Sequence, residues 1–214
     1  MKALLLKDLL VLRKQFRVMA LIFVVYGIWG FFADNYLFLA SFIPFIFVMM
    51  TMTSFSFDDT YKWTGYALAL PISRRQLVFS KYLLTLLLVA IGGIASSIYG
   101  YLMLFILKES ITSEFLLGCL TSISIGLTSF FILLPIVFQF GVEKARYIMF
   151  LLFMIPFLLL LAMERFGFLE QISLDRISDT VFSKYLLLGE AGLVLFAFFI
   201  SLPLSLWIVN RKEY

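Results

Sequence analysis

Residues 82–107 read YLLTLLLVAIGGIASSIYGYLMLFIL, and this charge-free run of 26 residues decides the fold. An α-helix needs about 20 apolar residues to cross the hydrocarbon core of a membrane, and about 17 to 25 are tolerated. The stretch therefore predicts a transmembrane helix that is long enough to tilt or to protrude from the bilayer.

Stretches of similar length and polarity recur along the chain. The six expected spans cover residues 16–32, 36–57, 82–107, 115–140, 147–163 and 187–209. We therefore predict an all-α integral membrane protein with six transmembrane helices, in which residues 1–214 form a single transmembrane domain.

The composition agrees with a membrane protein and excludes much chemistry. Hydrophobic residues make up 63% of the 214 residues and charged residues 14%, whereas a soluble domain is about a quarter charged. The chain has no histidine and one cysteine, Cys119, so it lacks the commonest general base and any thiolate cage for a metal. It has no phosphate-binding G-x-x-x-x-G-K-[ST] loop. We expect no catalytic residue, no metal and no cofactor in this chain.

Lysine and arginine predict the orientation. Thirteen of them flank the expected spans on the side of both chain ends, and four lie on the other side. Because basic residues are retained in the cytoplasm, we expect both termini to be cytoplasmic. The net charge of +4 is then explained by anionic lipid, without nucleic acid.

Residues 1–17 form an amphipathic segment. Leu5, Leu9, Leu12 and Phe16 fall on one stripe of a helical wheel, away from the basic residues. This pattern favours an interfacial elbow helix that bends into the first span. A plain positively charged anchor is the alternative.

The loop at residues 58–80 reads DDTYKWTGYALALPISRRQLVFS and is longer than a connection needs. Asp58 or Asp59 is a candidate helix cap. An apolar face follows at i, i+3, i+4 and i+7, made by Trp63, Tyr66, Ala67 and Leu70.

Pro71 ends this short helix, and Ser73 with Gln76 forms a capping box that opens the next one. Exposed aromatic residues beside Arg74 and Arg75 are typical of a protein interface. An aromatic belt lying on the membrane is the alternative.

Small residues recur every fourth position in the third and fourth spans. The two rows are Gly92, Ser96 and Gly100, and Gly118, Ser122 and Gly126. Such rows allow close helix packing, so we expect these two spans to pack on each other.

Two further loops stand out. The tight, charged segment 140–146 contains Glu143, Lys144 and Arg146 and is a candidate second contact for the same partner. Between residues 164 and 184, an apolar stripe of Leu174, Ile177 and Val181 predicts a short outer helix.

The loop also carries a resemblance to a known family. The run from Asp58 to Trp63, the run Tyr66-x-Leu68-x-Leu70-Pro71-Ile72-Ser73-Arg74, and Leu77-x-x-Ser80-Lys81-Tyr82 together resemble a motif of ATP-binding-cassette type-2 exporter permeases. The opening MKALLLKDL and the segment 140–146 are similar to other parts of that family. The likeness covers essentially the whole chain.

The resemblance implies six spans, an N-terminal elbow helix, a coupling helix between spans two and three, and short extracellular helices between spans five and six. It implies dimers of permeases, homomeric or heteromeric, that pair with a separate ATPase subunit, which binds the ATP and Mg²⁺. It assigns the coupling surface to Asp59, Trp63, Tyr66, Leu70, Pro71, Arg74 and Arg75. Small members resemble bacterial plasma-membrane exporters of amphipathic peptides such as phenol-soluble modulins, or lantibiotic immunity transporters.

Other functions remain open. A channel or secondary carrier is disfavoured because no ionisable residue lies mid-span, and Glu190 lies near the outer end of the sixth span. A membrane enzyme is disfavoured by the missing histidine. A non-transporting immunity or scaffold protein is not excluded, and the substrate-binding residues cannot be assigned from the sequence.

Overall fold

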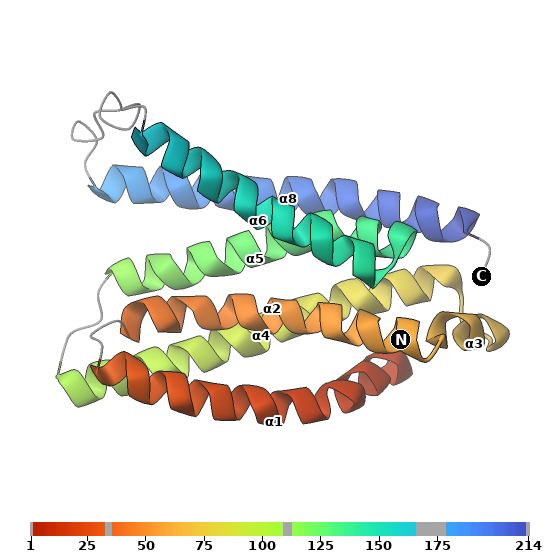
Figure 1. The fold of residues 1–214 in the computed structure, drawn as a ribbon, viewed down its shortest axis with the longest axis horizontal. Helices are drawn as coiled ribbons and strands as arrows, with labels where there is room; N and C mark the ends of the chain where they lie inside the picture. The colour runs from red at the N-terminus through yellow and green to blue at the C-terminus, as the bar shows by residue number, and fades with distance from the viewer. Residues whose placement is uncertain (1, 33–35, 109–112, 166–178, 213–214) are drawn as a thin grey trace.

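The computed structural model describes residues 2–32, 36–108, 113–165 and 179–212, and it places them in seven helices. Six long helices run along one axis, and the short helix α3 lies beyond one end of them (Figure 1). Their bounds are α1, Lys2–Phe32; α2, Tyr36–Thr60; α3, Trp63–Ala69; α4, Arg74–Leu107; α5, Ser113–Phe140; α6, Val142–Arg165; and α8, Asp179–Arg211. Both chain ends lie at the end of the bundle that carries α3 (Figure 1), which we call the α3 end.

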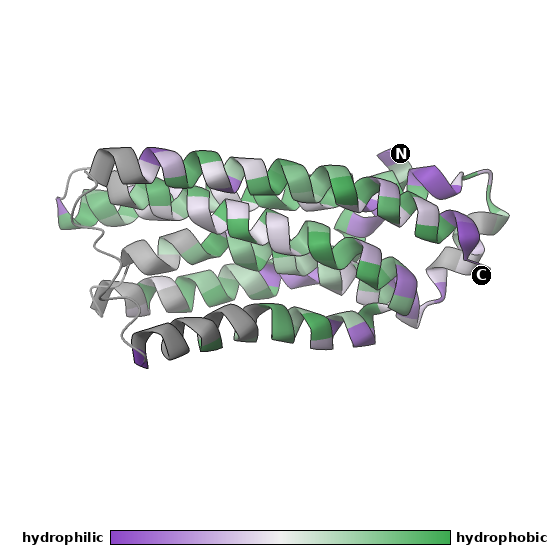
Figure 2. Ribbon diagram, turned by 90° about the horizontal axis from the view of Figure 1, so that it is seen from above, coloured by the Kyte–Doolittle hydropathy of each residue, from purple (hydrophilic) through white to green (hydrophobic). Residues whose placement is uncertain are grey.

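Three helical stretches among the described residues are long and apolar enough to cross a membrane. They are Arg74–Leu107, Phe115–Phe140 and Ser183–Arg211, and they coincide with three of the six expected spans. The long helices are mainly hydrophobic along their length (Figure 2). Large apolar side chains also face outward, such as Phe105 and Phe199, which are 84% and 69% exposed. A surface of this kind requires lipid around it.

α2 is the central helix and is apolar on opposite faces. Phe47 packs in a cluster with Leu12 of α1 and Leu88 of α4. Met52 packs in a second cluster with Phe130 of α5. A helix that is hydrophobic all round belongs in the interior, and this is where α2 lies.

The expected packing of α4 on α5 is confirmed in part, because α2 contacts both helices at one end of each small-residue row. A Cβ atom on Gly92 of α4 would lie 2.9 Å from both Phe47 Cβ and Pro44 Cα of α2. A Cβ atom on Gly126 of α5 would lie 3.2 Å from Val48 Cγ2, also on α2. Gly92 and Gly126 therefore allow close approach to a third helix.

α4 and α5 meet directly near the opposite end of the bundle. A Cβ atom on Gly100 would collide with the Phe115 ring of α5. The Ser96 hydroxyl donates to the Ala40 carbonyl of α2 at 2.7 Å and lies 3.2 Å from Cys119 Sγ of α5. Gly118 and Ser122 are half-buried on α5.

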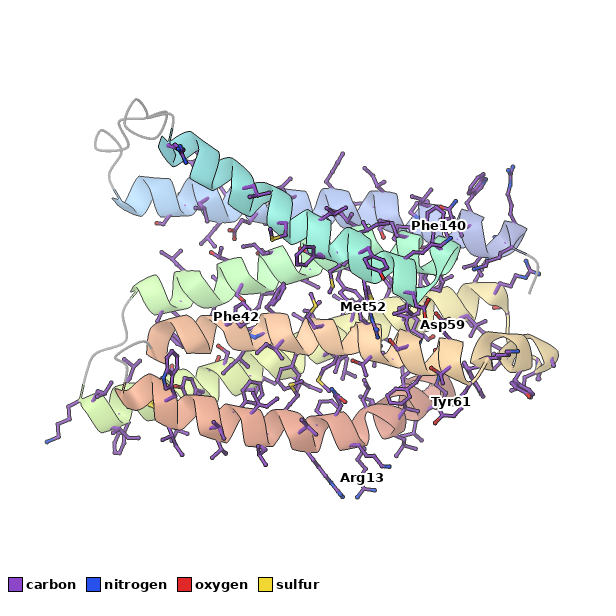
Figure 3. All side chains as sticks on the ribbon, in the orientation of Figure 1. Arg13, Phe42, Met52, Asp59, Tyr61 and Phe140 are labelled. Atoms are coloured by element: carbon purple, nitrogen blue, oxygen red, sulfur yellow. The ribbon has the colours of Figure 1, made fainter. Side chains whose placement is uncertain are left out.

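The expected elbow segment and first span form one continuous helix, α1. Leu12 is fully buried against α2 and α4, and Leu5, Leu9 and Phe16 pack around it. The apolar stripe therefore contacts protein. Arg13 points away from the bundle (Figure 3).

The predicted outer helix between residues 164 and 184 falls largely outside the described residues, since residues 166–178 are not among them. Residues 179–184 form the first turns of α8.

Replacing Gly92 with alanine is expected to destabilise the protein by about 1–3 kcal/mol, because the new methyl group overpacks the contact with the α2 backbone. The matched control is Gly189→Ala, since a Cβ atom there meets nothing within 4 Å. Unfolding midpoints are measured in one mild detergent by size-exclusion chromatography after heating. An unchanged midpoint for Gly92→Ala would contradict the packing of α4 on α2.

Candidate functional site

Four charged side chains meet inside the α3 end of the bundle. Lys7 and Asp8 come from α1, Asp58 from the last turn of α2, and Lys81 from the second turn of α4. Lys81 Nζ lies 3.1 Å from Asp8 Oδ1 and 2.5 Å from Asp58 Oδ2. Lys7 Nζ lies 2.8 Å from Asp8 Oδ1 and 2.5 Å from Asp58 Oδ1. Each lysine therefore bridges both aspartates, and we call this group the charge cluster.

The charge cluster is buried and electrically balanced. Asp8 is 1% exposed, Lys81 5% and Asp58 8%. The Ser54 hydroxyl of α2 connects Asp8 and Lys81. It donates a hydrogen bond to Asp8 Oδ1 at 3.0 Å and accepts one from Lys81 Nζ at 2.8 Å. Charges are buried at acceptable cost only when they are paired and hydrogen-bonded. The cluster therefore holds α1, α2 and α4 in one relative position.

The charge cluster also contacts α3 through Trp63. Lys7 Nζ lies 4.7 Å from the centre of the Trp63 ring, a cation–π contact. Trp63 is half-buried and packs with Leu4 of α1, Leu77 of α4 and the fully buried Ala67. One face of α3 is thus joined to the bundle.

The other face of α3 is open. Tyr66 is 68% exposed and Leu70 48%, and Pro71 is also exposed. The predicted face of Trp63, Tyr66, Ala67 and Leu70 is therefore divided between the inside and the outside. The predicted capping box is confirmed, because Ser73 Oγ accepts from the Gln76 backbone and the Gln76 side chain accepts from Ser73 N.

The predicted cap by Asp58 or Asp59 on the following helix is wrong. Both carboxylate oxygens of Asp58 pair with lysines of the charge cluster. Asp59 Oδ2 accepts a hydrogen bond from the backbone N–H of Val142, the first residue of α6, at 3.1 Å. Asp59 therefore caps a different helix, at a turn where Gly141 has a φ of +81°. Asp59 and Phe140 both lie toward the α3 end (Figure 3).

The two loops that the sequence predicts to act together are in contact. Besides the Asp59 cap, Arg146 Nη2 donates to Ser56 Oγ of α2 at 2.8 Å. Glu143, Lys144 and Arg146 are exposed on the first turns of α6.

The two neighbouring arginines of the predicted surface have different surroundings. Arg74 Nη1 donates to the backbone carbonyls of Val209, Asn210 and Lys212. It therefore caps the C-terminal end of α8, where free carbonyls attract a cation. Arg75 is exposed.

Sequence reasoning missed Lys7, Asp8, Ser54 and Lys81 as a group. The one available signal was the acidic residue Asp8, which is four positions from both Leu4 and Leu12 and therefore lies on the side of α1 that packs inward. Its partners are 46 and 73 positions away in the chain, so only the fold brings them together. Within the described ranges, no group of three or more His, Cys, Asp or Glu residues could hold a metal ion.

Lys81→Met is expected to cost about 3–5 kcal/mol, because it leaves two buried aspartates with one cation. Adding Asp8→Asn restores neutrality and is expected to recover part of the loss. The control is Arg75→Met at the exposed neighbour. Heat-induced unfolding midpoints of the unaltered chain, Lys81→Met, Asp8→Asn and the double variant give a double-mutant cycle, and strictly additive costs would contradict a coupled cluster.

Asp59→Ala is expected to lose the cap of α6, at a cost of about 0.5–2 kcal/mol. Asp59→Asn keeps an acceptor oxygen and is expected to lose less. Limited proteolysis in the 140–146 turn measures the fraying, and equal cleavage rates for the two variants would rule out the capping role.

Comparison with known proteins identifies the family. The family model described as ABC-2 family transporter protein matches residues 3–210. No curated protein and no solved structure matches the chain significantly. The membrane permeases of this family are transmembrane subunits without catalytic activity, and they generally work with a nucleotide-binding subunit. Because the match extends over nearly the whole chain, this multi-pass membrane protein belongs to the ABC-2 transporter family as a permease component.

Proposed function

We propose that the protein is the permease subunit of an exporter that moves a hydrophobic or amphipathic substrate, in particular a membrane-active peptide, out of a bacterial cell. ATP and Mg²⁺ bind only to a separate ATPase subunit. A second permease chain, identical or different, completes the transporter. Six helices, α1, α2, α4, α5, α6 and α8, cross the plasma membrane.

The observation that carries the proposal is the division of α3 into two faces. Trp63 and Ala67 face the bundle, whereas Tyr66 and Leu70 face away from it. A segment that only connects two helices needs no exposed tyrosine, whereas aromatic residues are favoured anchors in protein interfaces. Tyr66 and Leu70 therefore supply the contact with the ATPase subunit.

The inner face explains how a push on α3 reaches the membrane helices. Movement of Trp63 acts directly on Lys7, which is 4.7 Å from its ring. Lys7 is paired with Asp8 and Asp58, and Lys81 pairs with the same two carboxylates. Because no member of the charge cluster can leave without exposing a buried charge, α1, α2 and α4 move together.

The second cytoplasmic contact lies at the start of α6. Glu143, Lys144 and Arg146 are exposed there, and the Asp59 cap joins this turn to α2. A partner that covers both α3 and this turn engages two rigidly connected points. Arg75 and Pro71 lie at the edge of the same surface.

The proposed topology has the α3 end in the cytoplasm. The basic residues Arg13, Lys14 and Arg17 are exposed on α1, where they can reach anionic headgroups of the cytoplasmic leaflet. Six crossings return the chain to the side on which it began, in agreement with the two chain ends at one end of the bundle (Figure 1).

Tyr66→Ala with Leu70→Ala is expected to abolish binding of the ATPase subunit and ATP-dependent export while leaving the unfolding midpoint unchanged, because both side chains are largely exposed. The control is Tyr185→Ala, an equally exposed tyrosine at the other end of the bundle, 70% exposed on α8. The tagged chain is isolated from its native host in mild detergent, and co-purifying P-loop ATPases are quantified by mass spectrometry.

A stoichiometric ATPase that is lost only in the α3 double variant supports the proposal. Export and ATPase binding that persist in this variant would exclude α3 as the coupling surface. A chain that carries no ATPase in its unaltered form favours an immunity or scaffold protein that holds a toxin without transport.

A further inference from the structure

Glu190 is the acidic residue that lies farthest from an aqueous end among the described helices. It stands eleven residues into α8, inside the apolar stretch Ser183–Arg211. It lies seven residues after Ser183, about 10 Å along the helix at about 1.5 Å per residue. An ionisable group within an apolar helix is costly, and it commonly marks a functional site.

The surroundings of Glu190 leave one of its oxygens without a partner. The carboxyl group lies near the Ser124 and Thr121 side chains of α5. Its Oε2 atom is buried and has no hydrogen-bond partner among the residues that the structure describes. A buried acceptor of this kind carries a desolvation cost that only a donor can remove.

An apolar groove begins one turn from Glu190. It lies between α5 and α8 and has a volume of 490 Å³. Its walls are mostly aliphatic and aromatic, among them Leu193, Phe196, Ile200 and Ile132. Phe196 is 65% exposed and Ile200 50%, so the groove opens sideways into the space that lipid occupies.

Glu190 lies one turn beyond the end of the groove, on the helix face that lines it. Along α8, Glu190 is followed at i+3, i+7 and i+14 by groove residues Leu193, Ala197 and Leu204, which is one helix face. Along α5, Ser124 is followed at i+4 by the groove residue Thr128. Leu193 to Ile208 covers about 22 Å, at about 1.5 Å per residue. The long apolar groove thus has a carboxyl group one turn beyond one end.

We infer that Glu190 and the α5–α8 groove form a binding site for a cationic amphiphile, whose apolar part lies in the groove and whose ammonium or guanidinium group binds the free Glu190 oxygen. If the chain is an exporter permease as proposed above, this is its substrate site. The binding itself needs neither ATP nor a partner subunit.

Charge distinguishes this occupant from the alternatives. A neutral lipid chain fills the groove but donates nothing to Oε2. A second copy of the chain that packs through α8 would place its own Glu190 or an apolar face against the groove. Within the described part of α8, neither of these supplies a cation to Glu190. A charged hydrogen bond in a low-dielectric site discriminates strongly between a cationic and a neutral ligand.

The test uses two photoreactive probes with the same twelve-carbon diazirine chain, one ending in a primary ammonium and the other in a hydroxyl group. The full chain is placed in phosphatidylcholine nanodiscs without ATPase subunit. Labelled peptides are then mapped and quantified by mass spectrometry for the unaltered chain, Glu190→Gln and Glu190→Asp.

We expect the ammonium probe to label peptides within residues 121–139 and 190–208, and the label to fall about tenfold in Glu190→Gln, as for loss of one charged hydrogen bond. Glu190→Asp, which keeps the charge, is expected to retain most of it, and the hydroxyl probe is expected to label weakly and equally in all three proteins. Equal labelling by both probes, or an unchanged ammonium label in Glu190→Gln, would overturn the site and identify the groove as a lipid contact.

The result is independent of the coupling surface. Loss of labelling in Glu190→Gln with no ATPase co-purifying would leave a cation-binding membrane protein without a motor. Co-purification of the ATPase without charge-selective labelling would retain the permease and reject this site.

Discussion

The arrangement of the α3 end depends on a balance of four charges, of which Asp8, Asp58 and Lys81 are buried and Lys7 is half-buried. Two lysines and two aspartates from α1, α2 and α4 share their partners, so that each lysine contacts both carboxylates. Removing any one of them leaves the other three with an uncompensated charge, which is far costlier than breaking an exposed ion pair. The helices α1, α2 and α4 are therefore held in a fixed relative position at this end, and this position also fixes where α3 attaches.

Helix termini reinforce the same end of the bundle. Asp59 at the end of α2 caps α6, and Arg74 at the start of α4 binds the last carbonyls of α8. In both cases one helix satisfies the free backbone groups of another. Deeper in the bundle, the Tyr82 hydroxyl of α4 hydrogen-bonds with Ser201 and Ser205 of α8. These contacts join α2 to α6 and α4 to α8, so that a displacement of α3 would be transmitted to several helices together.

The α5–α8 pair differs in character from this braced end. Its contact is extensive at the centre, yet its outer face is an open apolar groove with a carboxyl group one turn beyond one end. Rigid contacts at one end of the bundle and an open apolar groove are the two features on which the proposals above rest. The proposed coupling to an ATPase subunit uses the first, and the proposed binding site uses the second.

The sequence by itself determined the all-helical membrane class, the presence of a short helix with Trp63 and Tyr66, its end at Pro71 and the Ser73 capping box. These follow from local rules, because hydrophobic length and caps act within a few residues. Only the tertiary structure decided that Asp8, Asp58 and Lys81 form one cluster, and that α2 packs against Gly92 of α4 and Gly126 of α5. Contacts between residues tens of positions apart depend on which helices become neighbours. Hydropathy does not predict these neighbours, because lipid-facing and protein-facing residues are equally apolar.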